Sequence, residues 1–82
     1  MFGYESKSKT RKETIDEVLS IVDEEIECLQ RLSDEYYVKA EGYAHGKDYY
    51  QSAEMMKKIM TVQNRIYDFN LLKTTIERRY NM

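Results

Sequence analysis

The chain has 82 residues, about a third of them charged, a net charge of −2, and neither proline nor tryptophan. This length allows one domain, and the composition is typical of long solvent-covered helices and argues against a sheet protein with many turns. Cys28 is the only cysteine, which excludes an internal disulfide framework and a zinc cage of several thiolates.

The apolar residues are too scattered for a membrane protein. No apolar run approaches the roughly 20 residues that a membrane span requires, and the first residues lack the apolar core of a secretion signal. We therefore expect a cytoplasmic protein with no membrane contact. Because so short a chain buries a modest core, we also expect self-association to supply part of its stability.

Residues 1–13 are polar and basic and show no apolar period, so they are predicted to form a flexible arm that precedes a helical domain over residues 14–82. The arm carries four basic residues: Lys7, Lys9, Arg11 and Lys12.

A first helix is predicted over about residues 14–41. Thr10 with Glu13, and Thr14 with Glu17, both fit the capping box that begins a helix, and Thr14 is favoured because the apolar period starts directly after it. Apolar residues then recur at steps of three and four, which places them on one stripe of a helix. That stripe comprises Ile15, Val18, Leu19, Val22, Ile26, Leu29, Tyr36, Ala40 and Tyr43, widened by Leu32.

A turn is predicted over residues 42–47, where Gly42 or Gly46 can take the left-handed conformation that ends a helix. Asp48, with Gln51 three residues later, signals a second helix over about residues 48–80. Its apolar stripe comprises Met55, Ile59, Val62, Ile66, Phe69, Leu72, Ile76 and Tyr80. A short connection forces two such helices to pack antiparallel, which predicts an all-α helical hairpin.

The second helix also carries a further apolar stripe beside the first, including Tyr49 and Ala53. A single partner helix cannot cover both stripes. We therefore expect two hairpins to associate as a homodimer, most simply as an antiparallel four-helix bundle. The residues predicted to form this oligomer interface are Met56, Met60, Tyr67 and Leu71.

No catalytic, cofactor-binding or metal-ligating constellation is recognisable. His45 is the only histidine, too few for a zinc or di-iron site, and Cys28 lies among glutamates that disfavour its thiolate. Neither Gly42 nor Gly46 begins a phosphate-binding loop, which would need a following Lys and Ser or Thr. We therefore expect a protein that is not an enzyme and takes no cofactor.

Three surfaces could bind a partner. Five tyrosines near the turn suit a protein interface or, equally, a plug at the end of the bundle: Tyr36, Tyr37, Tyr43, Tyr49 and Tyr50. Arg78 and Arg79 at the end of the second helix lie at the same end of a hairpin as the basic arm, which could bind nucleic acid. Residues 15–41 hold nine acids against two bases. An acidic outer face is formed by Asp16, Asp23, Glu27 and Asp34.

These surfaces give three hypotheses for function. The leading one is a non-enzymatic interaction protein that acts as an adaptor, regulator or inhibitor on another protein. The first alternative is a nucleic-acid-associated regulator that uses the basic end. The second is an acidic decoy, of the kind carried by phages and mobile elements, that inhibits a nucleic-acid-handling enzyme.

Overall fold

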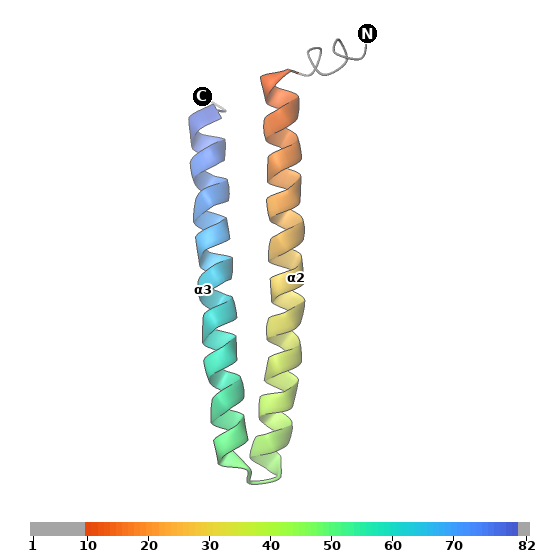
Figure 1. Cartoon of the computed structure of the whole chain (residues 1–82), viewed down its shortest axis with the longest axis vertical. Coiled ribbons are helices and arrows are strands. Elements are labelled where there is room, and N and C mark those ends of the chain that lie inside the picture. Colours follow the sequence, from red (N-terminus) through yellow and green to blue (C-terminus); the bar gives the residue numbers. More distant parts are fainter. Residues whose placement is uncertain (1–9, 81–82) are drawn as a thin grey trace.

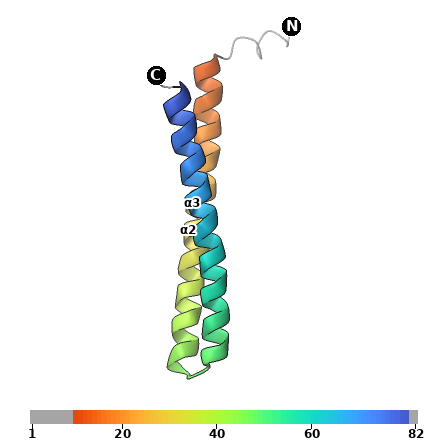
Figure 2. The same ribbon diagram turned by 90° about the vertical axis from the view of Figure 1, so that its left-hand side faces the viewer.

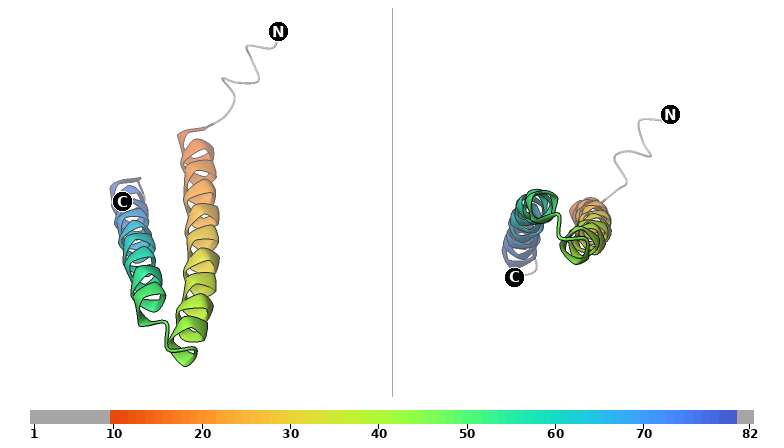
Figure 3. Two further views of the ribbon diagram at one scale, coloured as in Figure 1. Left: turned by 60° about the horizontal axis from the view of Figure 1, so that its bottom comes forward. Right: turned by 90° about the horizontal axis from the view of Figure 1, so that it is seen from below.

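The computed structural model describes residues 10–80, which form two long antiparallel helices (Figure 1). Helix α2 spans Arg11–His45 and helix α3 spans Tyr49–Tyr80, and no strand occurs between residues 10 and 80. The expected all-α hairpin is therefore confirmed. Viewed along its length, this part of the chain is a single layer of two helices, so the outer flanks of both helices are uncovered (Figure 3).

Helix α2 begins one turn earlier than predicted. Thr10 is its N-cap: the Thr10 hydroxyl accepts from the Glu13 amide at 3.1 Å, and Glu13 Oε1 accepts from the Thr10 amide at 2.9 Å. The favoured cap, Thr14, instead lies within the helix and donates its hydroxyl to the Thr10 carbonyl. The earlier start gains a turn of backbone hydrogen bonds without exposing apolar surface. Residues 11–13 thus belong to α2, and the rest of the predicted arm, 1–9, lies outside the described residues.

The turn is shorter than predicted, and its left-handed residue is not a glycine. Helix α2 continues through Gly42, since one glycine inside a helix costs only about 1 kcal/mol. Gly46 caps the helix with a φ of −82°, and Lys47 takes the left-handed conformation with a φ of 64°. The Asp48 amide donates to the Tyr43 carbonyl at 2.8 Å, and Asp48 Oδ1 accepts from the Gln51 amide, which caps α3 as predicted.

The facing sides of both helices follow a seven-residue repeat with alternating steps of three and four. In α2 the repeat comprises Ile15, Leu19, Val22, Ile26, Leu29, Ser33, Tyr36, Ala40 and Tyr43. In α3 it comprises Ser52, Met55, Ile59, Val62, Ile66, Phe69, Lys73, Ile76 and Tyr80. This period keeps two helices in contact along a left-handed supercoil, and they cross at a shallow angle (Figure 2).

The core extends from the middle of the hairpin toward the turn. Val22 and Ile26 of α2 cluster with Val62 and Ile66 of α3, and Leu29, Leu32, Tyr36 and Phe69 pack against this cluster. Ile59 is the most deeply buried apolar residue, only 2% exposed. The predicted apolar stripes therefore supply the core of the hairpin, but four of their members are exposed and do not belong to it: Val18, Tyr43, Leu72 and Tyr80.

Three polar contacts between the helices fix their register. The Gln63 side-chain amide donates to Ser33 Oγ at 2.9 Å, and Ser52 Oγ donates to the Ala40 carbonyl at 2.9 Å. Nearer the termini, Lys73 Nζ lies 2.8 Å from Asp23 Oδ1. Ser33 is 2% exposed, so its hydroxyl needs the Gln63 partner to avoid an unsatisfied buried group. A slip of one turn would break all three contacts.

Candidate interaction surface

One flank of α3 carries no charge over seven turns. Directly beside its core positions, eight residues repeat with the same steps of four and three. They are Tyr49, Ala53, Met56, Met60, Gln63, Tyr67, Asn70 and Thr74, and we call them the α3 stripe. All eight are exposed, Met60 and Tyr67 each at 64%. Leu71 borders the stripe and is also exposed, so the four predicted interface residues all lie uncovered on this flank.

The opposite flank of α3 shows what an ordinary solvated helix side looks like in this chain. It carries charges of both signs at the corresponding positions: Glu54, Lys58, Arg65, Asp68 and Arg79. Lys58 on this side lies 5.7 Å from the centre of the Tyr36 ring. Since both flanks belong to one helix, helix propensity does not explain why charge is missing from only one of them.

The acidic residues of α2 lie on the same face of the hairpin as the α3 stripe. In an antiparallel pair with this repeat, the flank of α2 with Tyr37 and Glu41 adjoins the flank of α3 with Met56. A hollow of about 360 Å³ confirms this neighbourhood: Tyr37, Ala40, Glu41 and Ala44 line it from α2, and Ser52 and Met56 from α3. The predicted acidic residues continue this flank along α2, and we call them the acidic row: Asp16, Asp23, Glu27 and Asp34.

Two members of the acidic row are neutralised within the chain. Asp16 lies 3.2 Å from Lys12 Nζ, and Asp23 lies 2.8 Å from Lys73 Nζ. The hydrogen bond to Asp23 and the charge of Asp23 raise the pKa of Lys73 above its ordinary value; desolvation opposes this rise, and the charge of Glu77 adds to it. Within residues 10–80, Glu27 and Asp34 form no ion pair and are exposed. These two carboxylates are therefore available to an incoming base.

The five candidate tyrosines do not form one patch. Tyr36 is half-buried and packs against the core. Tyr37 lines the hollow beside Met56, and Tyr49 begins the α3 stripe, so these two share one face. Tyr43 is at a core position next to the turn, and Tyr50 points about 100° away from Tyr49 around the helix and is 71% exposed. Only two of the five therefore extend the uncharged face.

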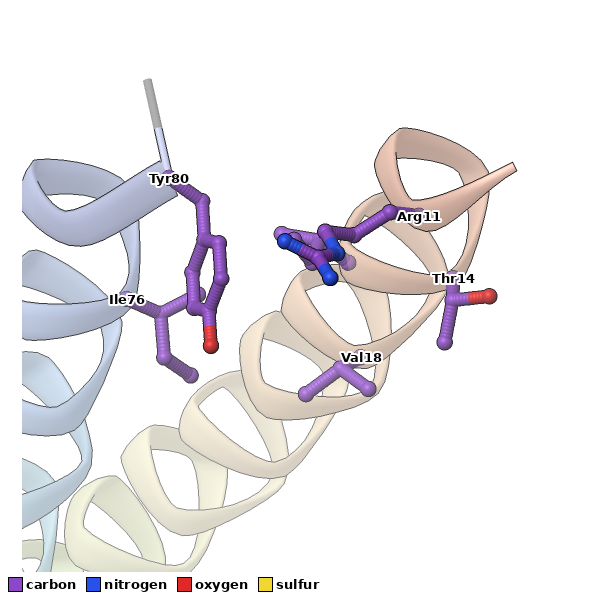
Figure 4. A pocket seen from close by; sticks show the side chains of 6 residues that line it. Arg11, Thr14, Val18, Ile76 and Tyr80 are labelled. Carbon is purple, nitrogen blue, oxygen red and sulfur yellow. The ribbon is translucent and has the colours of Figure 1, made fainter. Parts of the chain in front are cut away.

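An open groove lies between the two helices at the basic end of the hairpin. Arg11 and Tyr80 face each other from the two helices, with Val18 and Ile76 below them (Figure 4), and Ile15 also lines the groove. Arg78 and Arg79 are exposed in the last turn of α3, so the structure brings them to the same end as Arg11 and Lys12. Lys7 and Lys9 lie outside the described residues.

The described part of the chain, residues 10–80, shows no assembled metal site, and its cysteine lies at the surface. Cys28 is exposed, and its nearest polar partner is the Arg31 guanidinium, 3.4 Å from the sulfur. Within residues 10–80, no three His, Cys, Asp or Glu side chains are close enough together to hold a metal ion. Neither described helix combines the length and apolar composition needed to cross a membrane.

Sequence reasoning identified the apolar members of the α3 stripe and missed its polar ones. Gln63, Asn70 and Thr74 are polar, so a search for periodic hydrophobic residues does not find them. They can be recognised because every position of this heptad-spaced stripe is uncharged, although about a third of the residues in the chain are charged.

Comparison with known proteins adds no assignment to this geometry. No protein-family model, curated protein or solved structure matches the chain. The hairpin and its exposed faces are therefore the basis for its proposed function.

Proposed function

We propose that this chain is a non-enzymatic helical interaction module, an adaptor, regulator or inhibitor that acts by binding another polypeptide through the α3 stripe. The observation that carries the proposal is the contrast between the two flanks of α3, one charged and one uncharged. Burying a large apolar side chain is worth roughly 1.5–3 kcal/mol, and the stripe exposes two methionines and two tyrosines. An uncovered surface of this kind is typical of a protein interaction site.

A second copy of the chain is the occupant predicted from the sequence. In that form of the proposal, Met56, Met60, Tyr67 and Leu71 meet their counterparts, and two hairpins make a four-helix bundle. Exposure of all four residues in the single chain is compatible with it.

The test is to introduce charge into the α3 stripe. Met60→Glu with Tyr67→Glu should abolish binding to the partner that the tagged chain captures in its native cells, measured again with that partner purified. The matched control places two glutamates on the charged flank, by Thr61→Glu with Thr75→Glu, and should bind as the unchanged chain does. Equal binding by both variants, each shown to be helical by circular dichroism, would contradict the proposal.

Nucleic-acid binding is a second candidate, favoured by Arg11, Lys12, Arg78 and Arg79 lying at one end of the hairpin. It predicts DNA or RNA binding that weakens with salt, with a salt slope that becomes shallower by about 0.9 for each phosphate that a variant no longer neutralises. Arg78→Glu with Arg79→Glu should then abolish binding and leave partner capture through the α3 stripe unaffected.

An acidic decoy is the third candidate, favoured by the acidic row. It predicts that the chain competes with nucleic acid for the cleft of an enzyme. Changing Asp16, Asp23, Glu27 and Asp34 to lysine should abolish such competition, whereas the arginine changes should not.

A further inference from the structure

The face that joins the α3 stripe to the acidic row has two unlike halves. The α3 half presents Met56, Met60 and Tyr67 without charge, and the α2 half presents carboxylates. Packed helices are about 8–10 Å apart, so a third helix lying in the groove between α2 and α3 touches both halves at once. From Tyr49 to Thr74 the stripe is about 38 Å long, enough for about seven turns of such a helix.

The uncharged α3 half and the acidic α2 half together determine which kind of helix can bind this face. Its apolar seam must face α3, where charged groups would lose water without gaining a partner. Its flank toward α2 must carry lysine or arginine, because Glu27 and Asp34 have no ion pair among residues 10–80. We propose that this face binds a basic amphipathic helix of a partner protein, an inference that rests on the proposed function and specifies its partner.

Two methionines within the α3 stripe suit this kind of recognition. Met56 and Met60 lie one turn apart, and both are exposed. Methionine is unbranched and polarisable, so it adapts to seams of different shape and accepts Leu, Ile or Phe from a partner. Tyr37 on α2 adds an aromatic ring at the turn end of the same groove. The face should therefore recognise the pattern of a basic amphipathic helix more than one fixed sequence.

A second copy of this chain fits the face less well. Symmetric packing of the face on itself places the acidic row either opposite another acidic row or opposite an α3 stripe that holds no base. Lysine and arginine residues of α3, such as Lys57 and Arg65, lie off the stripe. Like charges facing each other oppose association, whereas a foreign basic helix pairs with them.

The experiment titrates the isotopically labelled full chain with designed helical peptides and follows amide chemical shifts. The basic probe is an amphipathic peptide of about 20 residues, about 30 Å long, with a Leu and Ile seam and lysine on one flank. The acidic probe has glutamate in place of each lysine. We expect the basic probe alone to bind, with shifts concentrated on Met56, Met60, Tyr67, Glu27 and Asp34, and with affinity that falls as salt rises.

Matched charge reversals locate the binding face. Glu27→Lys with Asp34→Lys should weaken the basic probe about tenfold, because two contacts become repulsive. Glu25→Lys with Glu35→Lys makes the same change of net charge on the other flank of α2 and should alter affinity less than about twofold, a limit set by screening. Equal binding of both probes, or equal weakening by both reversals, would overturn the inference.

Sedimentation of the unchanged chain separates this inference from the proposed function. If the unchanged chain forms a stable dimer and Met60→Glu with Tyr67→Glu dissociates it, the α3 stripe binds a second copy of the chain. That result would contradict the basic-helix partner but would remain consistent with the proposed interaction module. If that variant retained every interaction of the unchanged chain, the proposed function itself would be contradicted.

Discussion

The part of the hairpin from its middle to the turn and the part near the termini share one repeat but differ in packing. Every buried residue among those described lies between Val22 and Ala40 in α2 or between Met55 and Ile66 in α3. Toward the termini, Ile15, Leu19 and Ile76 also occupy core positions and are only half-buried. A groove of about 550 Å³ opens there beneath Arg11 and Tyr80. The repeat therefore selects which residues face the partner helix, and side-chain size and charge decide how closely they pack.

The largest expected effect is the loss of core packing in the closed part of the hairpin. Ile59→Ala should lower the free energy of unfolding by roughly 2–5 kcal/mol, as should Ile66→Ala, because each leaves a cavity among buried neighbours. Ile76→Ala, a half-buried residue at the open end, should cost about 1 kcal/mol or less. Urea denaturation followed by circular dichroism measures all three. Equal losses at Ile59 and Ile76 would mean that the two parts are packed alike.

At the open end, the cap contributes more than the apolar packing around it. Thr10→Ala should cost about 1 kcal/mol, because Thr10 exchanges two hydrogen bonds with Glu13. Thr14→Ala is the matched control within the helix, and it should leave the melting temperature unchanged or slightly higher, since alanine is the better helix former. If Thr14→Ala lowered the stability more than Thr10→Ala, Thr14 would be the N-cap of α2, as predicted from the sequence.

At the turn, a substitution is expected to stabilise the hairpin and not to destabilise it. Lys47 has a φ of 64°, a conformation that costs a residue with a side chain about 1–2 kcal/mol and glycine almost nothing. Part of that gain is offset by the greater freedom of glycine in the unfolded chain, so Lys47→Gly should stabilise the hairpin by about 0.5–1 kcal/mol. Gly46→Ala is the control: a Cβ there meets only ordinary contacts, the nearest at 3.6 Å, and should change the melting temperature little. Destabilisation by Lys47→Gly would refute the turn geometry.

The smallest effect is expected at Lys73, the only charged residue at a core position of α3. Because its pKa is raised, mainly by the hydrogen bond to Asp23, Lys73 contributes its full stability below pH 10.5 and loses it as the pH rises through the raised value. Asp23→Asn should return the pKa of Lys73 toward 10.5, as measured by NMR titration. Asp34→Asn should leave that pKa unchanged, and an equal shift in both variants would exclude the local pair as its cause.

The sequence predicted the helices and their facing sides because the steps of three and four are long and regular. It misplaced both ends of α2, since Thr10 and Thr14 offer the same capping box and Gly42 offers a helix stop that the hairpin does not use. It also missed Ser33 and Lys73 as core positions, because a polar residue there is recognisable only once Gln63 or Asp23 is known to lie opposite. For the surface, the apolar residues were predictable, whereas the shared face of the α3 stripe and the acidic row depends on how the two helices pair.

The short turn at Gly46–Asp48 also bears on the order in which this chain folds. Residues beside it, such as Ala40 and Ser52, are only twelve positions apart, whereas Arg11 and Tyr80 are joined by nearly the whole described chain. Closing a short loop costs less entropy, so contacts beside the turn should form before those of the more distant core cluster at Val22, Ile26, Val62 and Ile66. The hairpin should therefore close from the turn toward the termini, with high φ-values around Ala40 and Met55 and values near zero at Ile15 and Ile76.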